Sequence, residues 1–141
     1  MKITIINGPN LNLLGKREPE VYGRKTFETF LENLIEIFPD VQFNYFQSNV
    51  EGELVNAIQE HGFTSKGIIL NPAGYTHTSV AIGDAVAAIP AAVIEVHISN
   101  IFAREEFRKH SHVSAKCAGV ISGLGLNGYE LAVRYLINSS T

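Results

Sequence analysis

Short apolar runs alternate with stretches of helical periodicity along nearly the whole chain. The apolar runs predict buried strands at residues 3–6, 41–46, 67–70, 91–97 and 119–122. The periodic stretches predict helices at residues 26–38, 48–62, 78–88 and 127–136. This alternation is typical of a parallel sheet that helices cover on both faces. We therefore expect a single α/β domain over residues 1–141, a three-layer sandwich with a five-stranded parallel sheet in the flavodoxin-like order 2-1-3-4-5.

Two of the predicted helices begin at residues that can cap them. Thr26 precedes the first helix, whose buried face is expected to consist of Phe27, Phe30, Leu31, Leu34, Ile35 and Phe38. Ser48 and Glu51 have the spacing of a capping box, in which each side chain binds a backbone N–H of the first turn. We expect this box to begin the second helix.

The loop after the first strand, residues 7–23, is long for a compact domain, in which connections of about 4–6 residues are usual. Parallel sheets bind ligands beyond the carboxyl ends of their strands, so we interpret this loop as a lid over a site. It contains Asn10, whose amide offers uncharged donors and acceptors, and Arg17 and Tyr22 near its far end. A plain surface loop is the alternative.

Polar residues also follow the third and fourth strands. Asn71 ends the third strand and His77 precedes the next helix, although a turn-forming Asn and a helix-capping His are ordinary alternatives. Glu95 lies within an otherwise apolar strand, where period two places His97 and Ser99 on the same side. Because a buried carboxylate is costly unless it is paired, Glu95 is expected to bind one ring nitrogen of His97 and leave the other for proton transfer. A purely structural Glu–His pair is the alternative.

Charge and composition exclude several classes of function. The net charge of −3 provides no basic surface for nucleic acid. No apolar run is long enough to cross a membrane, and the single cysteine, Cys117, fits a reducing compartment, so we expect a cytoplasmic protein. His110 and His112 have no acidic or Cys neighbours that would complete a metal site. The loop over residues 7–23 contains no G-x-G-x-x-G or P-loop motif, so a phosphate-binding loop is not expected there.

The helix within residues 79–89 is apolar in nearly every direction around its axis. A helix packed on one face of a sheet needs only one apolar stripe, so the additional apolar surface predicts a second contact, in a homo-oligomer. Asp84 is the only charged residue on this helix and is expected to be bonded at that contact.

Six motifs, taken together and in this order, resemble the type II dehydroquinases, the dehydratases of the shikimate pathway. The motifs are residues 7–23, residues 47–49 with 51–54, residues 71–79, 95–100 and 104–108, and residues 123–125 with the final helix. The chain departs from the family at Phe102, where members often have His, and over residues 111–117. Neither departure is expected to touch a group with a chemical role.

The resemblance implies a flavodoxin-like fold and a cofactor-free enzyme that converts 3-dehydroquinate to 3-dehydroshikimate through an enolate. It implies Tyr22 as the base, with Arg17 supplying the positive charge that lowers the tyrosine pKa from its ordinary value of about 10. It also implies that Asn10 holds a water at the enolate oxygen and that His97, oriented by Glu95, protonates the leaving hydroxyl.

The remaining implied roles concern substrate binding and assembly. Asn71 and Ser99, with backbone N–H groups near Ile98, would hold the carboxylate and the C1 hydroxyl, while the ring hydroxyls would contact His77, Asp84 and Arg108. Family members assemble as dodecamers of four trimers, in which the aspartate matching Asp84 reaches a neighbouring site. A non-catalytic or nucleotide-binding flavodoxin-like module is the alternative function.

Overall fold

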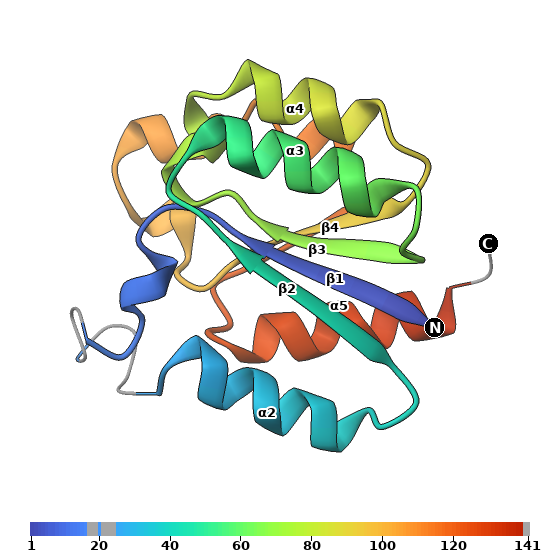
Figure 1. The fold of residues 1–141 in the computed structure, drawn as a ribbon. Helices are drawn as coiled ribbons and strands as arrows, with labels where there is room; N and C mark the ends of the chain where they lie inside the picture. Colours follow the sequence, from blue (N-terminus) through green and yellow to red (C-terminus); the bar gives the residue numbers. More distant parts are fainter. Residues whose placement is uncertain (17–19, 21–24, 140–141) are drawn as a thin grey trace.

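The computed structural model describes residues 1–16, 20 and 25–139, which form one parallel sheet between two layers of helices (Figure 1). The order of the sheet is β2-β1-β3-β4-β5 and all neighbouring pairs are parallel, which confirms the predicted fold class and strand order. The strands are β1 Lys2–Asn7, β2 Gln42–Gln47, β3 Gly67–Asn71, β4 Ala92–His97 and β5 Gly119–Ser122.

In the described part of the chain, α2 and α5 cover one face of the sheet and α3 and α4 cover the other (Figure 1). Their bounds are α2 Phe27–Ile37, α3 Glu51–Gly62, α4 Val80–Ala87 and α5 Asn127–Asn138. Short 3-10 helices occupy the connections: η1 Leu11–Leu13, η2 Ala73–His77, η3 Ile101–Ala103, η4 Glu106–Lys109 and η5 Ser114–Lys116. None of the helices in the described part of the chain is both long and apolar enough to cross a membrane.

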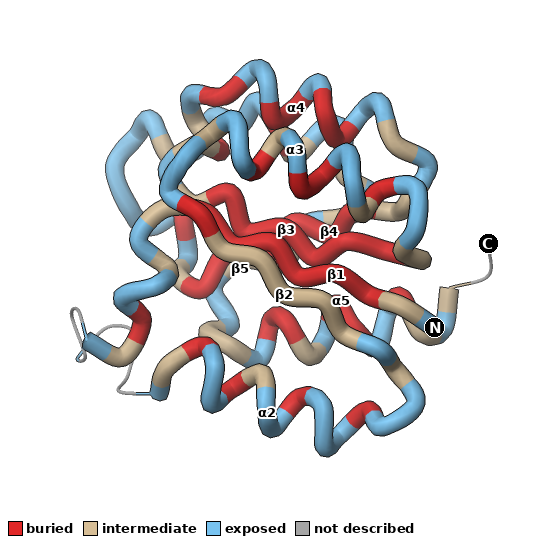
Figure 2. Tube along the Cα trace, in the orientation of Figure 1, coloured by how far each residue is buried: buried red, intermediate tan, exposed pale blue. Residues whose placement is uncertain are grey.

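The alternation of side chains along the strands creates two separate cores. Ile3 and Ile5 of β1 pack with residues of α2 and α5, whereas Ile6 packs with residues of α3 and α4. The central strands β1, β3 and β4 are buried along almost their whole length, as Figure 2 shows. Near-continuous apolar strands are expected for a parallel sheet that is covered on both faces.

The beginning of α2 confirms one capping prediction, and the same helix corrects another expectation. The Thr26 hydroxyl accepts a hydrogen bond from the backbone N–H of Thr29. Phe27 and Leu34 are buried as expected, but Ile35 is 47% exposed. One residue turns the helix by about 100°, so Ile35, the residue after Leu34, points away from the sheet.

The predicted capping box at Ser48 is wrong. Helix α3 begins at Glu51 with Val50 as its N-cap, and Val50 provides no side-chain cap. The Ser48 hydroxyl instead accepts a hydrogen bond from Val50 N and contacts the Glu53 carboxylate. A serine can close such a local turn in place of capping a helix, and here the turn lies outside the first helical turn.

Helix α4 packs closely against the segment that precedes β5 because residue 83 is glycine. A Cβ atom at Gly83 would lie 2.1 Å from the backbone oxygen of His112. The N–H of His112 donates to Thr76 O, which ties the same segment to η2. Any side chain larger than the hydrogen atom of glycine would therefore clash with the backbone of His112, which cannot rotate aside.

We predict that Gly83→Ala lowers the free energy of unfolding by about 1–3 kcal/mol, the usual range for overpacking a buried position. The matched control is Gly52→Ala, where an added Cβ has no atom within 4 Å. Alanine favours the helix over glycine, so this variant should gain about 0.5–1 kcal/mol. Urea unfolding at one fixed protein concentration measures both; equal effects of the two variants would refute the close approach.

Candidate active site

A cleft of about 180 Å³ opens at the carboxyl ends of β1, β3 and β4, where parallel α/β sheets bind their ligands. Residues from the segments that follow β1, β3 and β4 line this cleft. The lining residues are Pro9, Asn10, Leu11, Leu13, Leu14, Asn71, Ala73, Gly74, His77, His97, Ile98, Ser99, Ile101, Arg104 and Arg108.

Two residues of the cleft have a left-handed backbone conformation that is uncommon outside glycine. Asn10 has φ 71° and Ala73 has φ 54°. The N–H of Asn10 donates to Asn49 Oδ1 at 3.0 Å, and the N–H of Ala73 donates to Asn71 Oδ1 at 3.0 Å. Side-chain amides therefore hold both strained positions, as is common where a fold presents backbone to a ligand.

The Asn71 amide is oriented by a tyrosine from the far end of the chain. Asn71 Nδ2 donates to the Tyr129 hydroxyl at 3.0 Å, and that hydroxyl donates to Asn7 Oδ1 at 2.8 Å. Tyr129 is fully buried, and its burial raises the pKa of the phenol well above its ordinary value. The phenol therefore stays neutral and keeps both its donor and its acceptor role, which leaves Asn71 one amide hydrogen for a ligand.

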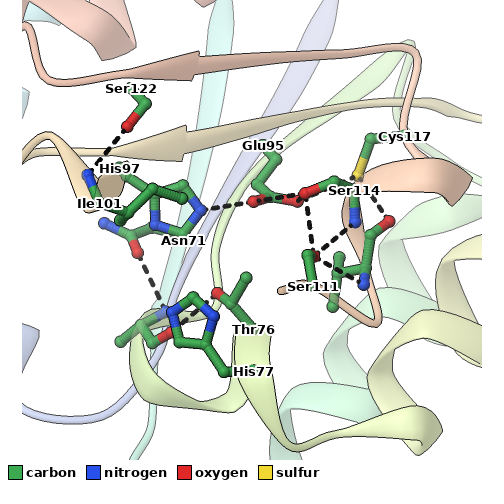
Figure 3. Close-up of polar contacts among 12 residues, drawn as sticks. Asn71, Thr76, His77, Glu95, His97, Ile101, Ser111, Ser114, Cys117 and Ser122 are labelled. Carbon is green, nitrogen blue, oxygen red and sulfur yellow. Dashed lines mark hydrogen bonds and ion pairs between the residues drawn. The ribbon is translucent and has the colours of Figure 1, made fainter. Parts of the chain in front are cut away.

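The expected contact between Glu95 and His97 is present (Figure 3). His97 Nε2 meets Glu95 Oε2; the Glu95 side chain is fully buried and that of His97 is 5% exposed. Because β5 continues the sheet beyond β4, the pair lies inside the sheet and not at its edge. His97 lines the cleft, and Nδ1 is the ring nitrogen left for a ligand there.

The segment behind Glu95 corrects the expectation that residues 111–117 touch no group of chemical interest. Ser114 Oγ donates to the carboxylate, 2.9 Å from Oε1 and 3.1 Å from Oε2. Cys117 Sγ lies 3.9 Å from Oε1. Burial and the neighbouring carboxylate raise the pKa of the Cys117 thiol to about 12, so it remains a neutral, weak donor.

The His77 ring is held by contacts with His110 and Phe107. Its Nδ1 donates to the carbonyl oxygen of His110 at 2.7 Å, and the edge of its ring packs on Phe107. Burial lowers the pKa of His77 below its ordinary value, with smaller effects of His97 and Arg108 in the same direction. At neutral pH the ring is neutral, so Nε2 can accept a hydrogen bond from a ligand hydroxyl.

Two arginines give the cleft positive charge. Arg104 Nη1 donates to Ser99 Oγ at 3.4 Å, and Arg108 Nε donates to Glu105 Oε1 at 3.2 Å. Both guanidinium groups line the cleft, where an anionic ligand would meet them.

The cleft brings together most of the predicted site residues but not all of them. Asn10, Asn71, His77, His97, Ile98, Ser99 and Arg108 line it, and Glu95 lies directly behind His97. Asp84 lies on the exposed side of α4 and does not line the cleft. Arg17 and Tyr22 lie outside the described residues. Within the described part of the chain, no group of three or more His, Cys, Asp or Glu side chains could hold a metal ion.

Reasoning from the sequence missed three residues that shape the site, namely Tyr129, Ser114 and Arg104. The sequence pattern predicted the final helix without assigning a role to Tyr129, although a buried phenol needs a hydrogen-bond partner. Arg104 was included only in the motif at residues 104–108, with no role of its own. Ser114 had no signal in the sequence, because an irregular segment brings it to Glu95.

Comparison with known proteins agrees with this geometry. The family described as "Dehydroquinase class II" matches residues 1–137. Two relatives named 3-dehydroquinate dehydratase are similar over the full length: that of Pelodictyon phaeoclathratiforme is 48% identical (100% of this chain, 95% of the relative), and that of Fusobacterium nucleatum is 54% identical (97% of each).

Solved structures agree as well. The crystal structure of a type II dehydroquinase from Butyrivibrio crossotus is 44% identical with a TM-score of 0.93, covering 98% of both chains. A 3-dehydroquinate dehydratase-like protein from Bifidobacterium longum is 26% identical with a TM-score of 0.70, covering 99% of both. The fold, the cleft and these similarities together show that the chain belongs to the class II dehydroquinase family.

Proposed function

We propose that the protein is a 3-dehydroquinate dehydratase, a hydro-lyase that removes water from 3-dehydroquinate to give 3-dehydroshikimate on the route to aromatic amino acids. The observation that carries this proposal is the cleft in which His97, backed by the buried Glu95, faces Asn10, Asn71 and the two arginines. The names of the similar proteins support the same activity.

In the proposed reaction, the phenolate of Tyr22 takes a proton from the carbon next to the ketone, and Arg17 keeps that phenol ionised. Both residues belong to the segment 7–23, which we propose as the lid of this single domain. The first part of the segment supports this role, because Pro9, Asn10, Leu11, Leu13 and Leu14 line the cleft. The lid would exclude water and place the base over the substrate.

Charge then develops on the ketone oxygen as an enolate forms. Asn10 supports this step through an ordered water that donates to the enolate oxygen. The enolate expels the C1 hydroxyl as His97 protonates it, which forms the conjugated enone and one water molecule. Glu95 keeps the His97 ring in place by its contact with Nε2, which leaves Nδ1 for the transfer.

Substrate binding is assigned to the rest of the cleft. Asn71 and Ser99, with the backbone N–H groups near Ile98, bind the carboxylate and the C1 hydroxyl. The ring hydroxyls bind to His77 through Nε2 and to Arg108.

The size of the cleft favours this substrate over the alternative of a nucleotide-binding module. Pockets for ligands of drug size usually measure roughly 300–1,000 Å³, whereas this cleft measures about 180 Å³ and fits a small ring. The reaction proposed here also needs only acid–base groups, so we propose no cofactor and no metal. The single thiol, Cys117, fits our proposal of a cytoplasmic enzyme.

Tyr22→Phe should abolish turnover while folding and substrate binding stay nearly intact, because it removes only the phenolic oxygen. Loss of a general base typically costs about 10²–10⁴ in rate. The assay is the rise in enone absorbance as 3-dehydroquinate is consumed. A wild-type protein without turnover would refute the dehydratase; a Phe variant that keeps more than about a tenth of the activity would refute the base.

His97→Ala should be almost inactive and Glu95→Gln should be impaired less, with non-additive effects because the two residues act as one unit. The measurement is kcat for both single variants and the double variant. Effects that multiply in the double variant would argue against the pair.

We also propose a homo-oligomer built from trimers, as a dodecamer, in which Asp84 reaches a neighbouring subunit's site and binds a ring hydroxyl. The outer side of α4 supports a second contact, because Val80, Ala81, Ala87 and Ala88 are exposed around Asp84. Val80, the largest of these side chains, is 57% exposed. Within the described residues, Asp84 has neither an ion pair nor a side-chain hydrogen bond, which is the state expected of a group completed by another subunit.

Light scattering of the purified protein should therefore report an oligomer of trimers at assay concentration. Asp84→Ala should raise KM, and inactive Tyr22→Phe subunits mixed with Asp84→Ala subunits should regain activity by forming some sites free of both changes. A fully active monomer would contradict both the trimer and the shared site.

A further inference from the structure

The Glu95 carboxylate receives its second strong hydrogen bond from a segment that does not line the cleft. His97 provides one donor from the same strand, and Ser114 of η5 contacts the carboxylate from the side opposite His97 (Figure 3). Ser114 Oγ lies 2.9 Å from Oε1 and 3.1 Å from Oε2, so the hydroxyl sits between the two carboxylate oxygens. Ser114 is not among the residues that line the cleft.

The hydroxyl is itself held in place. Ser111 Oγ accepts hydrogen bonds from the backbone N–H groups of Val113 and Ser114, at 3.0 and 2.9 Å. Ser111 Oγ also lies 2.9 Å from Ser114 Oγ. Val113 is fully buried against α4, so the short turn that carries Ser114 has a fixed distance from β4.

We propose that Ser114 is a positioning residue of the acid pair: its hydroxyl holds the Glu95 carboxylate toward His97 and shares the negative charge of that carboxylate. This inference rests on the proposed function in one respect, namely that His97 is the acid of the dehydration. It assigns Ser114 no contact with substrate.

The hydrogen bond from Ser114 is important because the carboxylate that accepts it is buried. Glu95 is fully buried, so its carboxylate depends on donors that the protein provides. Cys117 cannot substitute, because its thiol is a weak donor at 3.9 Å. A hydrogen bond to a charged group is stronger than one between neutral groups, and losing it leaves the carboxylate with His97 as its one close donor.

The direction of the effect follows from the charge of the pair. When the pair releases its proton, a net negative charge stays buried, and Ser114 stabilises that state most. Removing the hydroxyl therefore raises the proton affinity of the pair, which titrates as one unit. We therefore expect the Ser114→Ala variant to keep this proton to higher pH than the wild type does.

Other ionisable groups around the pair stay unchanged in this comparison. His77, Arg104 and Arg108 face His97 across the cleft, and Cys117 faces Glu95 from behind. Because Ser114→Ala alters none of them, a shift in the titration reports the hydroxyl itself.

The test is an NMR titration of the His97 ring in the full-length, ligand-free protein, with its signal identified by its loss in His97→Gln. Ser114→Ala should raise the midpoint by roughly 0.5–1 pH unit. Ser114→Thr, which keeps the hydroxyl, should titrate as the wild type does. The matched control is Ser122→Ala, another half-buried serine, whose hydroxyl bonds Ser99 O and Ile101 N but not Glu95.

An unchanged midpoint in Ser114→Ala, or the same shift in Ser114→Thr or Ser122→Ala, would overturn the proposal. In steady-state kinetics, Ser114→Ala should lower kcat by about 3- to 30-fold with KM within about twofold, and move the high-pH limb of kcat upward. A drop in kcat with no movement of that limb would also overturn it. If the wild type does not dehydrate 3-dehydroquinate, the proposed function fails, while the NMR titration still decides the role of Ser114.

Discussion

A fully buried carboxylate in the middle of the sheet is the constraint on which this site depends. Glu95 lies in β4 with apolar neighbours along the strand, and an ionised carboxylate there must receive hydrogen bonds from protein groups. His97 meets this need from the cleft side and Ser114 from behind. The irregular chain before β5 has to fold over β4 for Ser114 to arrive, and Gly83 of α4 provides the room for it.

The opposite half of the cleft is supported by a neutral network instead. Tyr129 joins Asn7 and Asn71, the last residues of β1 and β3, which are register partners. Burial raises the pKa of this phenol, so the network carries no charge at physiological pH. The Asn71 amide is therefore held by a neutral phenol, whereas the His97 ring is held by a buried carboxylate.

The sequence predicted the fold closely because local patterns determine it. Alternating strands and helices predicted the parallel sheet, the number of strands favoured the order 2-1-3-4-5, and period two paired Glu95 with His97. The capping box failed because Ser48 had a competing local partner, the N–H of Val50. The contacts of Ser114 and Tyr129 could not be predicted from local patterns. Ser114 lies 19 residues from Glu95 in the sequence and Tyr129 lies 58 residues from Asn71, and tertiary packing brings each pair together.

The same reasoning explains why residues 111–117 were misjudged. Comparing motifs identifies the groups that meet substrate, and it passes over residues that act through another side chain. The solvent exposure of a carboxylate determines how much its supporting contacts contribute. Glu105 is solvated, so its ion pair with Arg108 competes with water and can be lost at little cost. Glu95 is shielded from solvent, so the identity of residue 114 should influence how readily His97 gives up its proton.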